Sequence, residues 1–251
     1  MCETCGCSLP TDNKKSLDID ADQNHAVIKK IMSSNDKTAE HNRHKLNKHG
    51  IFCINIMSSP GGGKTKLLEA SIAELKKLYR IAVIEGDLET ENDAERIRAQ
   101  GVEAIQITTG SACHLDAHHV HQALHQLNLD TLDLIFIENV GNLVCPAAFD
   151  LGQHANIALL SVTEGDDKPL KYPVMFQKIH GLVISKIELL DYFDDFNMER
   201  ALDNFRKLAN QSPVWPLSAK TGRGMEAWLD WLVDQRTERK MLLNPQLETS
   251  E

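Results

Sequence analysis

The stretch that most constrains the fold is the glycine-rich turn Met57-Ser58-Ser59-Pro60-Gly61-Gly62-Gly63-Lys64-Thr65. The apolar run before it, residues 51–56, is rich in β-branched residues and predicts a strand. After it, leucine and isoleucine recur at helical spacing over residues 67–78, which predicts an amphipathic helix. A strand, a glycine-rich turn and a helix that opens with Gly-Lys-Thr are typical of the phosphate-binding loop of a nucleoside triphosphatase.

The residue types in this turn suit phosphate chemistry. Gly61, Gly62 and Gly63 let backbone N–H groups close on phosphate oxygens, and the helix N-terminus adds partial positive charge. We expect Lys64 to reach the β- and γ-phosphates and the Thr65 hydroxyl to bind Mg2+. A glycine-rich turn without a ligand is the alternative interpretation.

The composition excludes several classes of protein. With 36 acidic and 27 basic residues, the 251-residue chain has a net charge of −9, which argues against a nucleic-acid partner. No apolar run approaches the ~20 residues that a membrane-spanning helix needs. Three of the six cysteines fall within the first seven residues, which favours a metal site in a reducing cytosol over a disulfide framework. We therefore expect a cytoplasmic protein with one full core.

The N-terminal tail carries the second strong signal, Cys2-Glu3-Thr4-Cys5-Gly6-Cys7. Three thiols can wrap one ion, and the free α-amino group can supply a fourth ligand. A planar set of three sulfurs and one nitrogen favours Ni(II), whereas a tetrahedral set suits Zn(II). The alternative is a solvated tail with incidental cysteines. We expect a flexible tail over residues 1–24, a nucleotide-binding domain over 25–239 and a C-terminal tail over 240–251.

Two further loops follow predicted strands. Asp87 comes directly after the strand over residues 81–85, so we expect it to bind Mg2+ or orient water, although it could instead cap the next helix. The apolar strand over residues 132–137 ends in Glu138, and Gly141 follows, as in the second phosphate-sensing loop of GTPases. We expect the Gly141 N–H to meet the γ-phosphate and Glu138 to hold Mg2+ through water. Lys64, Asp87 and Glu138 are the predicted catalytic residues.

A second group of metal ligands lies near these loops. Cys113 and His114 follow a predicted strand, and Cys145 comes four residues after Gly141. If all three side chains hold one ion, the metal is connected to the loop that senses GTP hydrolysis. The bound metal and the bound nucleotide could then both bias one switch. The alternative is that both cysteines are small buried hydrophobic residues.

Histidines also recur at helical spacing. His114, His118, His121 and His125 share one stripe and could extend the metal site, but a solvent-facing stripe is the favoured interpretation. The histidines at 41, 44 and 49 are likewise interpreted as part of a solvated face.

The base-reading elements of GTPases have counterparts near the C-terminus. Ser185-Lys186-Ile187-Glu188 occupies the position of the guanine-reading motif Asn-Lys-x-Asp, with Glu188 as the carboxylate that accepts the guanine N–H groups. Ser218-Ala219-Lys220 matches the last GTPase element, whose backbone N–H meets guanine O6. Glutamate is one methylene longer than aspartate, so an ATPase of the same class stays open.

With these residues together, the chain resembles the HypB family of nickel-insertion accessory GTPases for hydrogenase. The segments that carry the resemblance are Cys2-x-x-Cys5-Gly6-Cys7, residues 58–65, Glu85-Gly86-Asp87, residues 113–117, residues 138–146 and Glu164-Gly165-Asp166-Asp167. Ser58 in place of the first glycine of the phosphate loop is a trait of this family. The resemblance implies an α/β P-loop NTPase fold of the SIMIBI class of GTPases. Such a fold has a mainly parallel sheet flanked by helices, and it dimerises around nucleotide.

The resemblance also implies a function. It implies GTP hydrolysis with GTP/GDP and Mg2+, a tight nickel site on Cys2, Cys5 and Cys7, and a weaker nickel or zinc site on Cys113, His114 and Cys145 that is shared across a homodimer. Because no side chain is an obvious general base, we expect the hydrolysis to be slow. Nickel would be delivered to the large subunit of [NiFe]-hydrogenase together with the small metallochaperone HypA. The competing readings are a chaperone for another metalloenzyme such as urease, a non-enzymatic metal-binding protein, and the ATPase.

Overall fold

The computed structural model describes residues 14–87, 92–110 and 112–243. The predicted N-terminal metal site on Cys2, Cys5 and Cys7 lies outside these residues. Within them, no helix combines the length and the apolar character that crossing a membrane requires.

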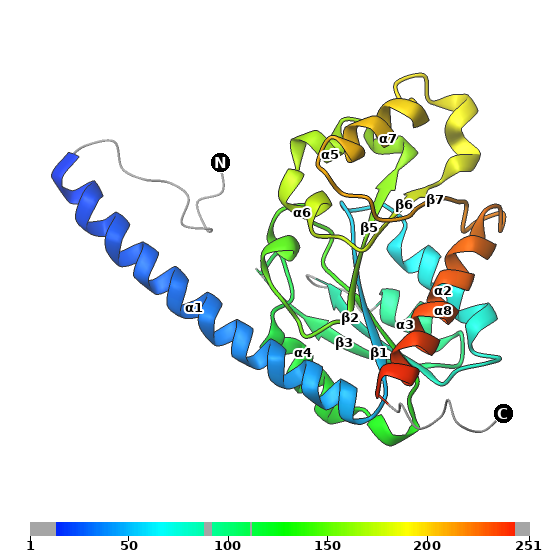
Figure 1. Ribbon diagram of the computed structural model, residues 1–251, viewed down its shortest axis with the longest axis horizontal. Coiled ribbons are helices and arrows are strands. Elements are labelled where there is room, and N and C mark those ends of the chain that lie inside the picture. The colour runs from blue at the N-terminus through cyan, green and yellow to red at the C-terminus, as the bar shows by residue number, and fades with distance from the viewer. Residues whose placement is uncertain (1–13, 88–91, 111, 244–251) are drawn as a thin grey trace.

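A parallel sheet forms the centre of the domain (Figure 1). In the described residues it has seven strands in the order β3-β2-β4-β1-β5-β6-β7, and every neighbouring pair is parallel. The strands are β1 (Phe52–Met57), β2 (Ile81–Asp87), β3 (Glu103–Thr108), β4 (Leu134–Glu138), β5 (Ala155–Ser161), β6 (Gly181–Ser185) and β7 (Val214–Pro216).

Helices connect the strands. The α-helices are α1 (Lys14–Lys48), α2 (Lys64–Leu75), α3 (Asn92–Arg98), α4 (Ala117–Gln126), α5 (Lys168–Lys171), α6 (Pro173–Gln177), α7 (Met198–Arg206) and α8 (Met225–Leu243). Short 3-10 helices are η1 (Leu129–Thr131), η2 (Cys145–Ala148), η3 (Val162–Glu164) and η4 (Ile187–Tyr192).

Alternating strand residues create two apolar faces. Ile54 and Ile56 of β1 pack with α2, α3 and α8 on one face. On the other face, Cys53 packs with α1 and α4, and Met57 packs with α6 and α7. The three layers confirm the predicted fold class, a mainly parallel sheet covered by helices on both sides.

The parallel arrangement also places the functional loops. Because all strands run in the same direction, the segments after β1, β2, β3, β4 and β6 leave the sheet at one edge, its carboxyl edge. The predicted phosphate loop, Asp87, the Cys113 segment, the Glu138 segment and the Ser185 segment therefore share that edge.

Both terminal helices exceed their predicted lengths. Helix α1 begins at Lys14, where the sequence predicted a flexible segment up to residue 24. Residues 11–49 contain neither glycine nor proline, so nothing in this stretch interrupts a helix, and Gly50 with φ +66° ends it. Helix α8 continues to Leu243, into the predicted C-terminal tail. The domain boundaries themselves stay predictions.

Candidate functional site

The glycine-rich turn is wrapped around its lysine. Gly61 and Gly63 have φ values of +73° and +98°, a region that favours glycine. The buried Lys64 donates from Nζ to the Ser58 hydroxyl at 3.3 Å. A side chain at Gly62 would place its Cβ 2.7 Å from Ser58 Oγ, so this position requires glycine. The turn thus has the tight backbone that a phosphate cradle needs.

A cluster of carboxylates lies beside the turn. The Thr65 hydroxyl donates to Glu138 Oε1 at 2.8 Å. Carboxylate oxygens of Glu85, Asp93 and Glu138 lie within 4.8 Å of one another, and Asp93 and Glu138 line a cavity of about 260 Å³ with Lys64 and Thr65. A hydroxyl and carboxylates are the oxygen ligands that Mg2+ prefers. These residues fit a magnesium ion at the end of the phosphate loop.

The electrostatics of this cluster favour a bound cation. Burial, and next the charge of Glu138, raise the pKa of Glu85 to about 8. Burial raises the pKa of Glu138 to about 7. Oε2 of each of these two side chains has no hydrogen-bond partner within the described part of the chain. A divalent ion would compensate the buried negative charge.

Two members of this cluster, Glu85 and Asp93, were not predicted from the sequence. Asp87, which was predicted, lies at the end of β2 outside the three-carboxylate group and contributes to the raised pKa of Glu85. Glu85 joins the cluster because the register of β2 and β4 pairs it with Glu138, and Asp93 reaches it from α3. Strand register was the missing signal. Asp87 stays a prediction as a magnesium ligand or water-orienting group.

The second predicted nucleotide loop touches the first. A Cβ built on Gly141 would lie 2.9 Å from Cα of Pro60, so the loop after β4 can approach the phosphate loop only with glycine here. This contact places the Gly141 backbone beside the phosphate turn, and its contact with a γ-phosphate stays a prediction.

The predicted base-reading residues form a pocket. A cavity of about 460 Å³ is lined by Gly63, Lys66, Leu67, Ser185, Lys186, Glu188, Leu217, Ala219 and Lys220. Ser218 is fully buried next to the lining residue Leu217 in sequence, and its Oγ accepts a hydrogen bond from the Thr221 N–H. Glu188 Oε2 is buried with no protein partner in the described residues, so it can accept N–H donors from a base.

Ser185 and Lys186 tie this pocket to the phosphate loop. The Ser185 hydroxyl donates to the Gly62 carbonyl at 2.7 Å, and Lys186 Nζ donates to the Gly61 carbonyl at 2.7 Å. Lys186 adopts a left-handed backbone with φ +61°, which turns the chain sharply after β6. The serine that replaces the usual asparagine therefore still holds the two loops together.

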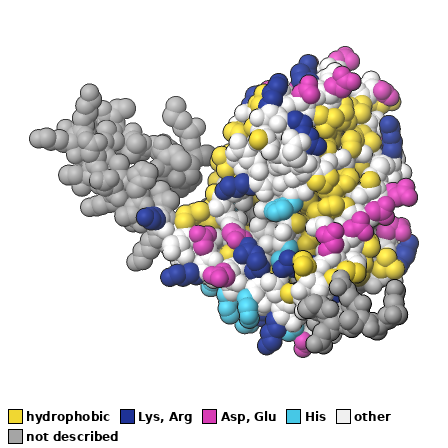
Figure 2. All heavy atoms as spheres, in the orientation of Figure 1, with side chains coloured by type: hydrophobic (Ala, Val, Ile, Leu, Met, Phe, Trp, Pro, Cys, Tyr) yellow, Lys and Arg dark blue, Asp and Glu magenta, His cyan; other side chains and the backbone are white. Residues whose placement is uncertain are grey.

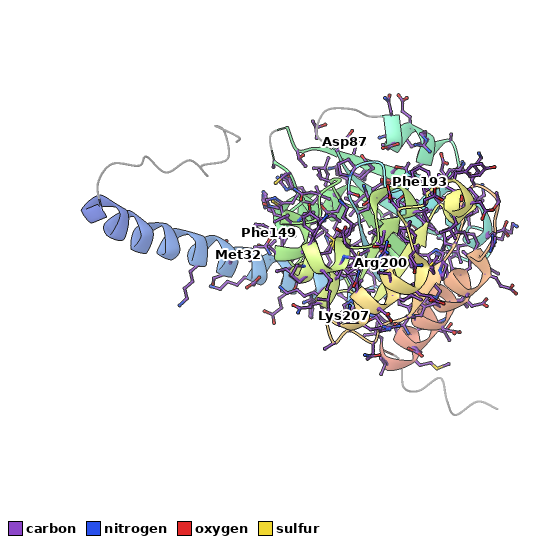
Figure 3. All side chains as sticks on the ribbon, turned by 90° about the horizontal axis from the view of Figure 1, so that it is seen from above. Met32, Asp87, Phe149, Phe193, Arg200 and Lys207 are labelled. Carbon is purple, nitrogen blue, oxygen red and sulfur yellow. The ribbon has the colours of Figure 1, made fainter. Side chains whose placement is uncertain are left out.

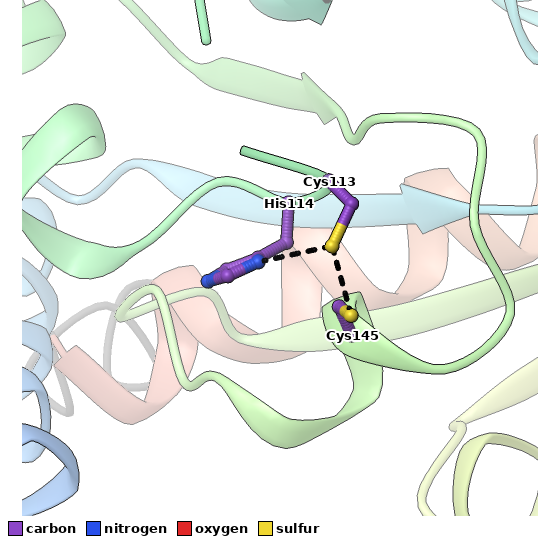
Figure 4. Close-up of side chains that lie close together, drawn as sticks. All are labelled: Cys113, His114 and Cys145. Atoms are coloured by element: carbon purple, nitrogen blue, oxygen red, sulfur yellow. Dashed lines mark hydrogen bonds between the residues drawn. The ribbon is translucent and has the colours of Figure 1, made fainter. Parts of the chain in front are cut away.

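The three predicted internal metal ligands come together (Figure 4). Cys113 Sγ lies 2.9 Å from Cys145 Sγ and 3.8 Å from His114 Nδ1. Neither cysteine forms a disulfide within the described residues, and all three residues are half-buried. Burial lowers the pKa of His114, which favours the neutral imidazole that binds metals. Two thiolates and an imidazole suit Zn2+ or Ni2+.

Aromatic packing orients the His114 ring. It stacks on Phe149 with the ring centroids 4.0 Å apart and an interplanar angle of 21°. Phe149 and Met32 of α1 line one cavity of about 560 Å³ and lie close together in Figure 3. The ring that stacks on His114 thus lines the same cavity as Met32 of α1.

One buried amide joins the metal cluster to the nucleotide loops. Asn139 follows Glu138 and is fully buried. Its Oδ1 accepts from the N–H groups of Leu115, at 3.2 Å, and Val140, at 3.0 Å. Its Nδ2 donates to Asn55 Oδ1 of β1 at 3.2 Å. The segment that carries Cys113 and His114 and the segment that leads to Gly141 therefore share one side chain.

The charged loop after β5 has a structural anchor. Asp166 is buried and accepts from Arg200 Nε at 2.8 Å and from the Asn197 N–H at 2.8 Å. The hydrogen bond from Arg200 lowers the pKa of this carboxyl. Asp166 therefore fastens the loop to α7.

Comparisons with known proteins agree with this geometry. The family model described as CobW/HypB/UreG, nucleotide-binding domain, matches residues 52–214. The hydrogenase maturation factor HypB of Rhizobium leguminosarum bv. viciae is 50% identical over 206 residues, covering 82% of this chain and 69% of that protein. The hydrogenase/urease maturation factor HypB of Helicobacter hepaticus is 42% identical over 233 residues, covering 91% of this chain and 92% of that protein.

A solved structure shows the same similarity. The crystal structure of HypB from Helicobacter pylori in complex with nickel superposes with a TM-score of 0.78 at 41% identity, covering 82% of this chain and 97% of that one. The family model covers more than half of the chain, and the relatives match over most of their own length. The chain therefore belongs to the HypB family, within the CobW/HypB/UreG group of nucleotide-binding domains.

Proposed function

We propose that this protein is a GTP-hydrolysing nickel metallochaperone. In this proposal it binds nickel, and also zinc, and it inserts nickel into [NiFe]-hydrogenase in the cytoplasm. A small metallochaperone of the HypA type and the hydrogenase large subunit are its partners. The names of the relatives, the nickel complex of the Helicobacter pylori protein and the internal cysteine–histidine cluster support this assignment.

The observation that carries the proposal is the shared Asn139 side chain. An ion on Cys113, His114 and Cys145 fixes the segment that donates to Asn139 through the Leu115 N–H. A γ-phosphate fixes the segment that donates through the Val140 N–H. A change in either segment moves the acceptor of the other, so nucleotide state and metal coordination bias one element.

Hydrolysis in this proposal depends on positioning. Lys64 and the backbone N–H groups of the glycine turn hold the phosphates, and Gly141 closes on the γ-phosphate. Mg2+, held by Thr65 and the carboxylates of Glu138, Glu85 and Asp93, would neutralise phosphate charge. No side chain in the described site is an obvious general base, so we expect slow turnover.

A homodimer completes the metal site in this proposal. Cys113, His114 and Cys145 supply three ligands and are half-exposed, so a second copy can supply more. Large hydrophobic side chains are exposed elsewhere on the domain surface, at Leu170, Val174, Tyr192 and Phe193. Figure 2 shows hydrophobic side chains at the surface over this part of the domain. A GTP-dependent dimer would cover them.

The test measures size and nickel binding together. The full-length protein is examined by light scattering and nickel titration with GDP, with a non-hydrolysable GTP analogue and with the matching ATP analogue. We expect a dimer and a changed nickel affinity with the GTP analogue alone, and no change at the internal site in Cys145→Ala. Nickel binding that ignores the nucleotide would contradict the delivery mechanism even in a working GTPase.

Base selectivity has its own test. Glu188 is proposed to accept the N1–H and N2–H donors of guanine, which adenine lacks. Glu188→Gln turns half of the carboxylate into a donor, and we expect it to lower the preference for GTP over ATP about 100-fold, in line with the loss of a charged hydrogen-bonding pair. Equal binding of GTP and ATP by the unaltered protein would support the ATPase instead.

A second recipient enzyme is a specific alternative. The Helicobacter hepaticus relative is named a hydrogenase/urease maturation factor. Nickel transfer from this protein to apo-hydrogenase large subunit and to apo-urease, measured side by side, separates the two recipients. We expect transfer to the hydrogenase subunit.

A further inference from the structure

Histidines from two helices meet where α1 passes α4. The ring of His41 on α1 lies 5.2 Å, centroid to centroid, from the ring of His121 on α4. The rings of His121 and His125 lie 4.6 Å apart, and their Nε2 atoms are 3.1 Å apart. Figure 2 shows histidine side chains gathered on the surface where α1 runs beside α4. The sequence showed the stripe on α4 but not its contact with α1.

A buried amide sets the orientation of His121. Asn42 is fully buried, and its Nδ2 donates to the carbonyls of Ala117, at 2.8 Å, and Leu151, at 3.1 Å. These bonds leave Asn42 Oδ1 as an acceptor, and His121 Nδ1 lies 3.0 Å from it. His121 must therefore carry its proton on Nδ1. Its Nε2 keeps the lone pair and faces His125.

This arrangement is the one that metal-binding histidines use. A ligating histidine usually donates its other ring N–H to a fixed acceptor, which orients the ring and raises its basicity. Burial lowers the pKa of His121, and repulsion from nearby basic side chains, His125 first, lowers it further, which favours the neutral ring. The lone pair on Nε2 is thus available near neutral pH.

The separation of the two Nε2 atoms also suits one ion. Two nitrogens that each lie about 2.0–2.1 Å from a metal are about 2.9–3.4 Å apart at cis or tetrahedral angles. The 3.1 Å between His121 and His125 falls in this range. Histidines at i and i+4 on one helix face are a known metal-binding pair. A direct hydrogen bond from His125 to His121 is the competing explanation.

We infer that His121 and His125, with His41 from α1, form a binding site for Ni2+ or Zn2+ at the α1–α4 junction. Imidazole nitrogen is a favourable ligand for both ions. The exposed His41 ring needs only a side-chain rotation to become the third ligand. The charge of Lys45 near the cluster opposes a cation, so this site is weaker than the thiolate site on Cys113 and Cys145. The inference does not rest on the proposed GTPase function.

The experiment isolates this site from the thiols. The full-length chain carries alanine at every cysteine that the thiol sites use: 2, 5, 7, 113 and 145. Ni2+ alone, then Zn2+ alone, is titrated calorimetrically into this parent without nucleotide. We expect one equivalent to bind, and His125→Ala to weaken it at least 10-fold. The matched control His44→Ala changes an exposed histidine of α1 and leaves the affinity unchanged.

His125→Ala is the decisive variant because it leaves the His121–Asn42 hydrogen bond in place. In thermal melts without metal it should match the parent, while saturating Ni2+ raises the Tm of the parent and not that of the variant. Equal nickel affinity in the parent and His125→Ala would overturn the inference. So would a parent that binds no ion, because the 3.1 Å contact would then be a hydrogen bond only.

Discussion

The carboxylates at the two edges of the parallel sheet differ in their hydrogen-bond partners. At the carboxyl edge, Glu85, Glu138 and Glu188 each have a buried carboxylate oxygen without a protein partner in the described structure. At the amino edge, Asp133 precedes β4 and accepts from the Arg80 N–H, from Arg80 Nε and from Arg236.

His154, which precedes β5, is a second polar residue of the amino edge with protein partners. Its Nδ1 accepts from the Cys53 N–H, and its Nε2 donates to Asn47 Oδ1. Burial lowers the pKa of His154 to about 3, so the ring stays neutral and both bonds persist. Buried polar atoms without partners reduce stability and are tolerated where a ligand satisfies them. The carboxylate oxygens at the carboxyl edge are therefore available to a ligand, whereas Asp133 and His154 at the amino edge contribute to stability.

The largest effect is expected from Lys64→Ala, which removes a proposed phosphate-binding group from the carboxyl edge. Loss of the ammonium group should reduce GTP hydrolysis by about 10²–10³-fold or more, the scale for removing one transition-state contact. Nickel binding at Cys113, His114 and Cys145 should stay unchanged. Steady-state phosphate release and nickel titration of the same sample test both halves. Equal loss of nickel binding in a folded variant would mean that the two sites are not separable.

Cys145→Ala tests the proposed metal site at the carboxyl edge. Removing one of three ligands should weaken nickel binding at the internal site by more than about 100-fold, since loss of an outer-shell partner alone weakens metal binding about 10–100-fold. Affinity for GDP should change little.

The matched control is Cys53→Ala. The thiol of Cys53 is buried in the core, where burial raises its pKa to about 12, so it is a poor ligand. This control should lower stability and leave nickel binding intact. Nickel binding that depended on Cys53 as much as on Cys145 would point to a general loosening of the fold.

The features that the sequence predicted are those that depend on residues close together in the chain. The phosphate loop, the strands and the cysteine–histidine set were predicted because each depends on local order: a periodic run, a glycine turn or adjacent ligands. The parallel sheet and the family were confirmed. The roles of individual site residues stay predictions.

What the sequence could not predict depends on tertiary contacts. Glu85 joins Glu138 through strand register, and His41 meets His121 through helix packing. The role of Asn139 was not predictable, because its hydrogen bond with the Leu115 N–H joins residues that are far apart in sequence. The extra turns of α1 were missed because its first residues show no apolar period, which was the signal used to predict helices.

Asn139→Ala sharpens the comparison within the carboxyl edge. The change leaves the Leu115 and Val140 N–H groups without their acceptor, so stability should fall by about 1–3 kcal/mol. The ratio of nickel affinities with GDP and with the GTP analogue should move toward one. Nickel titrations in both nucleotide states measure this ratio. A ratio that stayed at the wild-type value would show that the coupling runs elsewhere.

Asp133→Asn tests the amino edge and should have the smallest effect. Partial burial alone would raise the pKa of Asp133, but hydrogen bonds from Arg80 and Arg236 outweigh it and lower the pKa to about 2. A carboxyl with a lowered folded pKa stabilises the protein above its unfolded pKa, and that stabilisation is lost as the pH falls toward 2. The variant should therefore be less stable by about 1–2 kcal/mol at pH 7 and should approach wild type only near pH 2.

Urea unfolding of both proteins from pH 7 down to pH 2 measures the convergence. Asp130→Asn is the matched control, because that carboxylate is 84% exposed and pairs with His49 at 2.9 Å, an arrangement worth about 0–1 kcal/mol. GTP hydrolysis and nickel affinity should be unchanged in both variants at pH 7. A loss of either activity in Asp133→Asn, at a stability that keeps it folded, would show that the amino edge reaches the ligand sites and that the division between the two edges is wrong.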